Sequence, residues 1–337
     1  MRVVVRADGG ATMGVGHVMR CLALAERLTD AGATVTFITR TEESALLAHI
    51  GAQGYEVVAL PRRVERLADL DTLIERATAI GATAAVVDLS GFGAEAQAAV
   101  RSAGLRLTVI DDLAGARFVS DVVLNQNIDA RAAAYATEPY TRLLLGPRYA
   151  LLRRAFVGRT ASTEGRRPRV LVTMGGGDAD NVTLRALQEA DALDADFALD
   201  VVLGPAFGHG DTIATAARNA RHQVAIHRDP ADLAGLMTRA TLALSAAGST
   251  SWELAHLGVP ALLVVLADNQ AGSAAGLAAA GFAVSLGEAG RLSGGALREA
   301  MAALLADPAR RSRMSEVGRA LVDGAGAARV AAEVLAA

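Results

Sequence analysis

Lysine is absent from the 337 residues, and all 33 basic side chains are arginine. This absence excludes a Schiff base on lysine and the phosphate-binding lysine of a Walker-type loop. Cys21 is the only cysteine, which excludes an intrachain disulfide and a metal site built from thiolates. The six histidines are scattered, and none shows the H-E-x-x-H spacing of a zinc hydrolase. Composition alone therefore removes several large classes of enzyme.

Strong charge and long apolar runs are also missing. A net charge of −3 gives no strong field for nucleic acid or anionic lipid. The longest uncharged stretch, residues 269–287, is rich in Ala and Gly and predicts a buried helix plus a strand rather than a membrane span. The N-terminus reads as a strand, without the features of a secretory signal. We expect a cytoplasmic, globular protein with no nucleic-acid partner and no stable membrane insertion.

What the chain does contain is a regular alternation of short apolar strands with helical stretches. Because several strands are apolar on both faces, the pattern predicts a doubly wound α/β sheet with buried parallel strands. The strands expected in the first half are Val3–Arg6, Thr34–Thr39, Glu56–Leu60, Ala84–Asp88, Leu107–Asp111 and Val122–Asn125. The helices expected between them include Val18–Thr29, Val64–Ile80 and Ala94–Ser102.

The alternation stops at the polar stretch "VGRTASTEGRRPRV", residues 157–170, and then restarts. The strands expected in the second half are Val170–Met174, Ala198–Leu203, Gln223–His227, Leu242–Ser245 and Ala261–Leu266. The length also favours two domains. We therefore predict two Rossmann-like domains, 1–157 and 158–337, with the last helix as a candidate to pack back on the first. Ligands of such sheets bind beyond the carboxyl ends of the strands, so an interdomain cleft is expected.

The first loop with residues suited to chemistry is "RADGGATMGVGHVMR", residues 6–20. Gly14 and Gly16 permit close backbone approach, and the helix that follows attracts anions at its N-terminus. The same partial positive charge disfavours imidazolium, so His17 is expected to stay neutral and able to accept a proton. A neutral imidazole there suits a general base, whereas the alternative is a histidine that only caps or packs at the turn.

The second loop is "MGGGDADN", residues 174–181. Its three glycines after a strand, with Asp180 or Asn181 available as helix cap, suit a turn that holds a phosphate. The alternative is a tight left-handed turn without a ligand. The spacing lacks the third glycine of the dinucleotide fingerprint, which argues against NAD.

The third loop is "SAAGSTSWELAHLGVPALLVVLADNQ", residues 245–270. Gly248, Ser249 and Thr250 open a helix and form a natural anion site. Glu253, one turn further on, could accept hydrogen bonds from ribose hydroxyls, or it could simply compensate the helix dipole. Trp252 is expected in the core rather than as a platform for a base.

Asp111 and Asp112 end a strand in "VIDDLA". Two adjacent carboxylates at such a position could hold a divalent metal or orient a sugar hydroxyl. A strand-end turn capped by aspartate explains them equally well.

Together these segments resemble the UDP-sugar hydrolases of the pseudaminic acid pathway. The resemblance runs in order from about residue 1 to 287. Its segments are "RADGGATMGVGHVMRCLALAERL", "VIDDLA", "VVLNQN", "LLLGPRYALLRRAF", "LVTMGGGDADNVTLRAL", "VVLGPAFGH" and the third loop. It implies a GT-B-type fold with the nucleotide held mainly by the second domain. It also implies removal of UDP from UDP-2,4-diacetamido-2,4,6-trideoxy-L-altrose without metal or cofactor, and a relationship to the N-acetylglucosaminyltransferase of peptidoglycan assembly.

The resemblance also implies roles for particular residues. His17 would activate the water that attacks the anomeric carbon, within a substrate-binding segment that includes Gly14, Gly16 and Arg20. The remaining substrate-binding candidates come from both halves of the chain. They are Asp111; Gly175 and Gly176 over the sugar region; Ile226 and His227 near uracil; Gly248, Ser249 and Thr250 at the diphosphate; Glu253 at the ribose; and Asn269 and Gln270 facing the sugar.

One departure from the family concerns the sugar. After Asp88 the family usually carries an aromatic or polar pair, often His-Tyr, whereas this chain reads Leu89-Ser90-Gly91-Phe92. A differently decorated sugar is therefore an open alternative. So are a glycosyltransferase on the same fold, whose lipid acceptor could use Leu46, Leu47, Ile50, Arg62 and Arg63, and a non-catalytic UDP-sugar binding protein.

Overall fold

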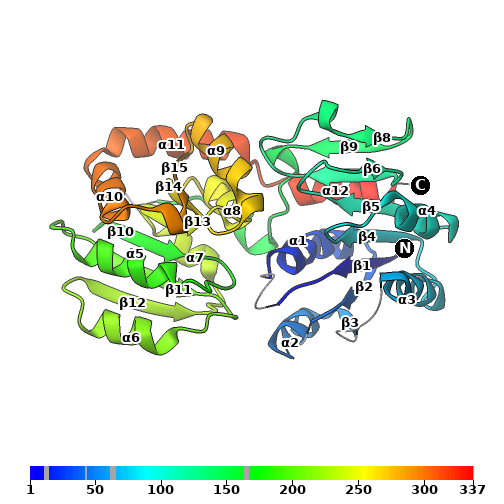
Figure 1. Cartoon of the computed structure of the whole chain (residues 1–337), viewed down its shortest axis with the longest axis horizontal. Coiled ribbons are helices and arrows are strands. Elements are labelled where there is room, and N and C mark those ends of the chain that lie inside the picture. Colours follow the sequence, from blue (N-terminus) through cyan, green and yellow to red (C-terminus); the bar gives the residue numbers. More distant parts are fainter. Residues whose placement is uncertain (11–14, 42–43, 61–65, 163–166, 337) are drawn as a thin grey trace. The chain divides into compact units, whose positions relative to one another are not determined.

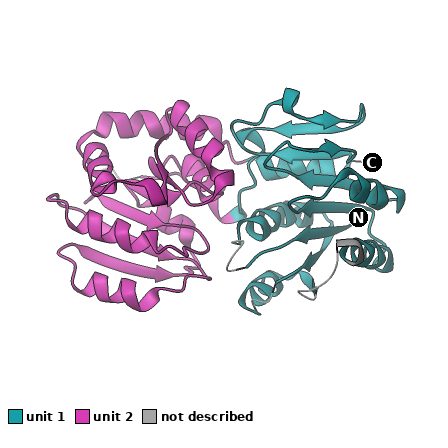
Figure 2. Ribbon diagram, in the orientation of Figure 1, with its two compact units in different colours: residues 1–154, 325–337 teal, residues 155–324 magenta. Residues whose placement is uncertain are grey.

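The computed structural model describes residues 1–10, 15–41, 44–60, 66–162 and 167–336. These residues form two compact units (Figures 1 and 2). Unit 1 comprises Met1–Arg154 and Ala325–Ala337, and unit 2 comprises Ala155–Gly324. The division falls three residues before the expected boundary, and the last helix belongs to unit 1.

Unit 1 is built on a parallel sheet with the strand order β3-β2-β1-β4-β5-β7-β9 (Figure 1). Its strands are β1 (Arg2–Ala7), β2 (Thr34–Thr39), β3 (Glu56–Ala59), β4 (Ala84–Asp88), β5 (Arg106–Ile110), β7 (Val122–Asn125) and β9 (Arg142–Leu145). A separate parallel pair joins β6 (Arg117–Phe118) and β8 (Ala136–Thr137). The chain reverses its direction of growth between β1 and β4, which makes the carboxyl ends of these strands the switch point of the sheet.

Helices cover both faces of this sheet because its strands are apolar on both sides. Val3 and Val5 pack on one side with α1 (Gly16–Asp30) and α12 (Gly326–Leu335). Val4 and Val87 pack on the other, against α3 (Arg66–Ala79) and α4 (Ala94–Ser102). The remaining helix, α2 (Ser44–Ala52), adds Leu46 and Ile50 to the first core.

The return of the chain to unit 1 depends on a glycine. Gly326, the first residue of α12, lies so close to the backbone of Ala150 that an added Cβ would collide with it. The helix then buries Val330 and Val334 in the core that contains Val3 and Val5. The hydrophobic residues of α12 therefore complete unit 1.

Unit 2 repeats the architecture with the strand order β12-β11-β10-β13-β14-β15, again parallel. The strands are β10 (Arg169–Thr173), β11 (Ala198–Leu203), β12 (Gln223–Arg228), β13 (Leu242–Ala246), β14 (Ala261–Val265) and β15 (Ala283–Glu288). The helices are α5 (Val182–Asp191), α6 (Gly210–Arg218), α7 (Leu233–Thr238), α8 (Thr250–Leu257), α9 (Ala271–Ala279), α10 (Ala296–Ala306) and α11 (Pro308–Leu321). Its switch point lies between β10 and β13.

Short 3-10 turns complete the secondary structure. They cover Ala132–Ala134, Pro147–Tyr149, Arg154–Phe156, Asp268–Gln270 and Ala289–Arg291. The expected helix and strand within residues 269–287 are α9 and β15. No helix in the described ranges has the length and hydropathy needed to cross a bilayer.

Candidate functional site

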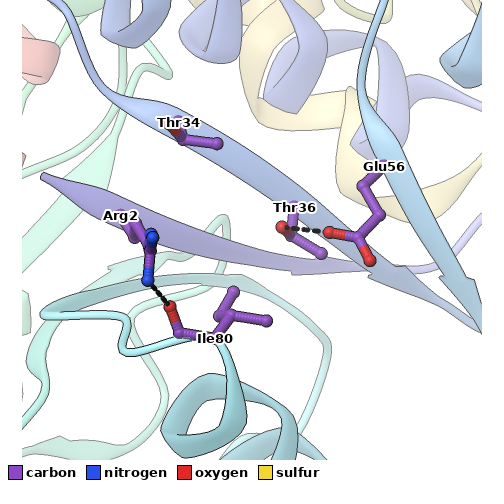
Figure 3. A pocket seen from close by; sticks show the side chains of 5 residues that line it. All are labelled: Arg2, Thr34, Thr36, Glu56 and Ile80. Carbon is purple, nitrogen blue, oxygen red and sulfur yellow. Dashed lines mark hydrogen bonds between the residues drawn. The ribbon is translucent and has the colours of Figure 1, made fainter.

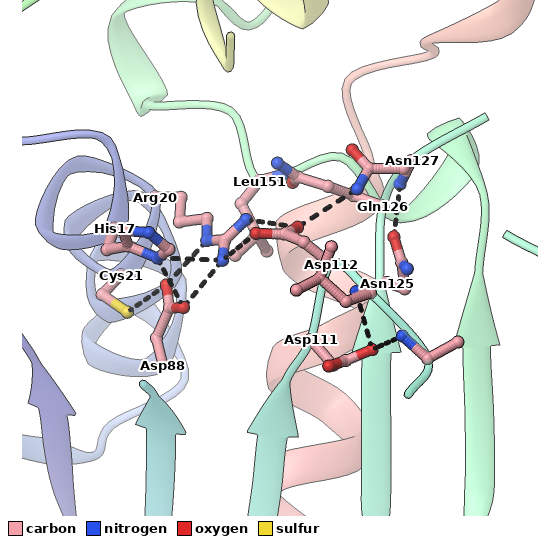
Figure 4. A network of polar contacts seen from close by, with 12 residues as sticks. His17, Arg20, Cys21, Asp88, Asp111, Asp112, Asn125, Gln126, Asn127 and Leu151 are labelled. Carbon is pink, nitrogen blue, oxygen red and sulfur yellow. Dashed lines mark hydrogen bonds and ion pairs between the residues drawn. The ribbon is translucent and has the colours of Figure 1, made fainter. Parts of the chain in front are cut away.

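His17 lies at the switch point of unit 1. It is the second residue of α1, the helix that follows β1, while Asp88 is the last residue of β4. Strands β1 and β4 are neighbours in parallel register, with Ala7 opposite Asp88. The topology therefore brings two residues that are 71 positions apart to the same carboxyl edge (Figure 4).

The imidazole of His17 is held by one nitrogen. Nδ1 lies 2.8 Å from Oδ1 of Asp88, and 22% of the His17 side chain is exposed. Because an ionised carboxylate can only accept, Nδ1 carries the hydrogen and Nε2 keeps its lone pair. This is the arrangement in which a carboxylate orients a histidine base.

The helix N-terminus was expected to lower the pKa of His17, but the pKa is shifted in the opposite direction. The hydrogen bond to Asp88, supported by the charges of Asp88 and Asp112, raises the pKa of His17 above its ordinary 6.5, against burial and the charge of Arg20. A carboxylate in direct contact outweighs the partial charge of a helix end. His17 is therefore a stronger base than the sequence indicated.

Asp88 is buried, with every side-chain oxygen engaged. Arg20 donates from Nε to Oδ2 at 2.6 Å and from Nη2 to Oδ1 at 2.7 Å, and Cys21 Sγ lies 3.7 Å from Oδ2. Burial alone would raise the pKa of Asp88, but the charge and hydrogen bonds of Arg20, with those of His17, lower it to about 2. Asp88 is therefore ionised at pH values well above 2.

Asp112 continues this network from the loop after β5 (Figure 4). Arg20 Nη1 and Nη2 each donate to one of its oxygens at 2.9 Å, and Asn127 Nδ2 donates at 3.2 Å. The guanidinium of Arg20, expected among the substrate-binding groups, is thus buried between two carboxylates.

Asp111 stabilises the loop that follows β5. Its Oδ2 accepts from the backbone amides of Leu113 and Ala114, at 3.2 and 2.7 Å, and from the Tyr135 hydroxyl at 3.1 Å. These bonds are those of the capped strand-end turn that the sequence left as an alternative for Asp111. Within the part of the chain that the structure describes, no three His, Cys, Asp or Glu side chains gather as metal ligands.

Asp88 and the pairing of Arg20 were not found by sequence reasoning. A carboxylate at the end of a buried strand is the only signal that the sequence carries, and its value depends on knowing that β4 lies beside β1. Gly14 lies outside the described residues, and Gly16 is the exposed first residue of α1.

In unit 2 the switch point carries two loops with different helix ends. After β13, Gly248 and Ser249 lead into α8 at Thr250, and the cap residue Ser249 makes no side-chain hydrogen bond to the helix. Gln270 approaches the same loop, since a Cβ added to Gly248 would lie 3.7 Å from its Nε2. The first turn of α8 also holds the buried Glu253, and the neighbouring Trp252 is in the core as expected.

The loop after β10 is already occupied by a carboxylate. Asp178, rather than the expected Asp180 or Asn181, accepts from the amides of Val182 and Thr183 at 2.9 and 2.7 Å. Asn181 does occupy the N-cap position, but in its left-handed conformation the side chain makes no capping hydrogen bond, and Asp178 accepts these bonds instead.

Gly175 has φ +82, and Gly176 packs so tightly that a Cβ on Gly204 would collide with both their carbonyl oxygens. The left-handed turn that the sequence weighed as an alternative is therefore present at Gly175.

The remaining candidates are separated along unit 2. Ile226 on β12 is 37% exposed, and His227 turns its side chain to Asp200, with Nε2 2.8 Å from Oδ1. Arg169 Nε pairs with the same carboxylate at 2.6 Å. Asn269 is exposed in the turn Asp268–Gln270.

Solved structures share the fold of this chain. The MurG protein of Acinetobacter baumannii superposes with a TM-score of 0.71 and 16% sequence identity, covering 99% of this chain and 98% of that one. The chain has the GT-B fold. The two Rossmann-like sheets of this fold are the sheets of units 1 and 2, whose carboxyl edges are described above.

No protein-family model matches the chain. It is 28% identical to the spore coat polysaccharide biosynthesis protein SpsG of Bacillus subtilis, over 98% of this chain and 97% of that protein. It is 29% identical to the N-acetylglucosaminyltransferase of Clavibacter michiganensis that acts on pyrophosphoryl-undecaprenol N-acetylmuramyl-pentapeptide, over 98% and 95%.

Two further relatives are matched over part of their length. A UDP-2,4-diacetamido-2,4,6-trideoxy-beta-L-altropyranose hydrolase of Campylobacter jejuni is 26% identical over 56% of this chain and 65% of its own. An uncharacterized protein of Methanocaldococcus jannaschii is 25% identical over 80% of this chain. The chain spans 56% of the length of that protein.

A pocket of about 300 Å³ lies away from the GT-B carboxyl edge, at the amino ends of β1, β2 and β3 (Figure 3). Three of its polar side chains have partners within it: Arg2 Nη1 donates to the Ile80 carbonyl at 2.6 Å, and Thr36 donates to Glu56 at 3.1 Å. The expected site residues are all elsewhere.

Proposed function

We propose that the chain is a UDP-sugar hydrolase in which His17 is the general base. A water oxygen attacks the anomeric carbon of the sugar, the bond from that carbon to the diphosphate oxygen breaks, and UDP leaves with the electron pair. The proton of the attacking water passes to Nε2 of His17. The observation that carries the proposal is the His17–Asp88 hydrogen bond at the switch point of unit 1.

The environment of His17 matches what a base of this kind requires. Asp88 orients the ring through Nδ1 and stabilises the imidazolium that forms when Nε2 takes up the proton. The raised pKa of His17 increases its affinity for that proton, and the ring is unprotonated at a pH above this raised value. General-base assistance of this type contributes about 10²–10⁴-fold to a rate.

We assign the binding of the nucleotide to unit 2. The N-terminus of α8 has no side-chain cap, so backbone amides near Gly248, Ser249 and Thr250 suit the diphosphate, whose developing charge they would stabilise. The N-terminus of α5 is taken by Asp178, which disfavours a phosphate there. We place the ribose at Glu253, the sugar near Gln270 and Asn269, and uracil against the backbone of Ile226 and His227.

The names of the relatives support the substrate class. The Campylobacter relative is a hydrolase of a diacetamido-trideoxy UDP-sugar, and the Bacillus relative acts in polysaccharide biosynthesis. We therefore propose an amino-deoxy UDP-sugar as substrate, and nonulosonic acid or related polysaccharide biosynthesis as the process.

A glycosyltransferase is the second candidate, because the Clavibacter relative is a transferase that matches nearly the full chain. The same base would then deprotonate a hydroxyl of the acceptor instead of water. The apolar patch that a lipid acceptor could use is reduced in this structure, since Leu46 and Ile50 are core residues of unit 1. Arg62 and Arg63 lie outside the described residues.

The two candidates are separated by UDP release without an acceptor. We expect purified protein to release UDP from at least one member of a panel of amino-deoxy UDP-sugars, with the anomer of the free sugar recorded by NMR. UDP release that begins only when a sugar or lipid acceptor is added would establish the transferase. UDP binding with no turnover of any panel member, with or without acceptors, would contradict both.

A further inference from the structure

We propose that Arg20 and Asp112 are positioning residues which tune the proton affinity of His17: Arg20 holds Asp88 against the ring, and Asp112 supplies the second negative charge that keeps this buried cluster able to accept a proton. The proposal rests on the assignment of His17 as the base. Neither residue is required to touch the substrate.

The geometry ties the four side chains into one unit. Arg20 makes two contacts with each carboxylate, all between 2.6 and 2.9 Å, and its side chain is 8% exposed. Its Nη2 also lies 3.1 Å from Nδ1 of His17, where it acts as a nearby charge and not as a hydrogen-bond partner, because Nδ1 donates to Asp88. A guanidinium with two bidentate partners is fixed in orientation, so Asp88 is fixed as well.

The count of charges explains why Asp112 matters. With His17 neutral, Asp88 and Asp112 carry two negative charges and Arg20 carries one positive charge, so the cluster is −1. Uptake of a proton by His17 brings it to zero. Without the carboxylate of Asp112, the same uptake would take the cluster from zero to +1 in a poorly solvated position, beside a guanidinium. Charge of one sign accumulating in such a place is disfavoured.

The groups that act on His17 come from three elements. Asp88 ends β4, Arg20 lies one turn further along α1, and Asp112 follows β5; all three influence the imidazole. The thiol of Cys21 faces Asp88 rather than the ring. The signs of these influences differ, because the two carboxylates favour imidazolium and the guanidinium opposes it.

Because the influences differ in sign, the proposal predicts opposite shifts of the His17 titration midpoint when Arg20 and Asp112 are replaced. A merely structural role predicts no such opposite shifts. The titration of His17 is followed by NMR of its ring in the substrate-free protein, with the resonance assigned from its loss in His17→Gln. In Asp112→Asn the midpoint is expected to move to lower pH, and in Arg20→Gln to higher pH. Asp112→Glu should restore a midpoint near that of the wild type. Asp200→Asn, which alters the His–Asp–Arg contacts of unit 2, is the matched control and should leave His17 unchanged.

The same variants are then assayed for UDP release across pH. The acid limb of kcat/KM should move with the NMR midpoint in Asp112→Asn, while KM changes little. An unchanged or raised midpoint in Asp112→Asn would overturn the proposal, whether or not Arg20→Gln folds. Midpoints that move as expected in a protein that releases no UDP would instead contradict the hydrolase assignment and leave the electrostatic coupling intact.

Discussion

Units 1 and 2 share the same order of parallel strands around their switch points, yet they equip those points differently. In unit 1 the switch point holds charged side chains: His17, Asp88 and Arg20 meet at the carboxyl ends of β1 and β4. In unit 2 the switch point holds glycine-rich loops and the uncapped N-terminus of α8. One sheet thus presents an imidazole held by a carboxylate, and the other presents backbone amides.

Unit 2 contains the same three residue types in another place. Asp200 on β11 contacts Arg169 on β10 and His227 on β12, within the strands rather than beyond their ends. His227 is held through Nε2, whereas His17 is held through Nδ1. The two clusters thus differ in their position in the sheet, and this position decides what each cluster can reach.

The largest expected effect is on turnover. His17→Gln should reduce UDP release by about 10²–10⁴-fold, because it removes the base, while UDP binding measured by calorimetry is retained. His227→Gln is the matched control and should keep most of the rate, since the proposal gives its side chain no role in chemistry. Near-normal turnover in a His17 variant would contradict the proposal that the His17 cluster supplies the base and the His227 cluster does not.

The next largest effect is on stability, which should differ between variants of Asp88 and of Asp200. Asp88→Asn leaves Arg20 buried without a full partner and is expected to destabilise unit 1 by about 3–5 kcal/mol. Asp200→Asn, whose partners are partly exposed, should cost about 1–3 kcal/mol in unit 2. Urea unfolding can separate them, because Trp252 is the only tryptophan and is buried in unit 2, while circular dichroism reports both units. If Asp88→Asn shifted the urea midpoint reported by Trp252 fluorescence and left the circular dichroism transition unchanged, this division would be contradicted.

In the wild type, acid should remove the contribution of Asp88 to the free energy of unfolding. The folded pKa of Asp88 is lowered from 3.8 to about 2, so its charge stabilises the folded state at pH above 3.8. That contribution, roughly 2 kcal/mol, is lost as the pH falls from about 4 to 2. Unfolding free energies measured across this range should fall in the wild type and fall less steeply in Asp88→Asn. Equal slopes would show that Asp88 is not held as described.

A smaller effect is expected on nucleotide affinity. Ser249→Asp would place a carboxylate at the open end of α8, as Asp178 already does at α5, and should weaken UDP binding by about tenfold or more through repulsion of the diphosphate. Asp178→Asn should leave UDP affinity unchanged. The reverse pattern would move the diphosphate to α5.

The smallest effect concerns the same two helix ends without a ligand. Asp178→Ala removes a cap and should cost about 1 kcal/mol of stability, whereas Ser249→Ala should cost less than about 0.5 kcal/mol because Ser249 caps nothing. The comparison is made by thermal unfolding. Equal losses would mean that Ser249 serves α8 as Asp178 serves α5.

Much of the fold could be predicted from the sequence because the strands are short, apolar on both faces and bounded by glycine or polar residues. The bounds predicted for Thr34–Thr39, Ala84–Asp88, Val122–Asn125 and Ala198–Leu203 match the structure. Strand β9, Arg142–Leu145, was not predicted. It is a four-residue edge strand with only one buried residue, so it lacks the burial on both faces that marks the central strands. The return of α12 to unit 1 depends on contacts between residues more than 170 positions apart.

The candidate site was predictable only where its residues are local. The segments that contain His17 and Gly248–Thr250 follow strands and open helices, and this pattern is visible in the sequence. Asp88 was missed because its role depends on strand order. The direction of the pKa shift of His17 was missed with it, because that shift depends on the contact with Asp88. The cap at Asp178 was missed because the left-handed conformation of Asn181 is not encoded by residue type alone.

The most direct test of the account is the fate of solvent oxygen when an amino-deoxy UDP-sugar is turned over in water enriched in oxygen-18, with no acceptor present. The expected result is label on the anomeric carbon of the released sugar and none in the UDP, with labelled sugar appearing about 10²–10⁴-fold more slowly in His17→Gln. Label in the UDP would place the attack on phosphorus, and an unlabelled or absent free sugar would show that water is not the nucleophile; either result would contradict the account.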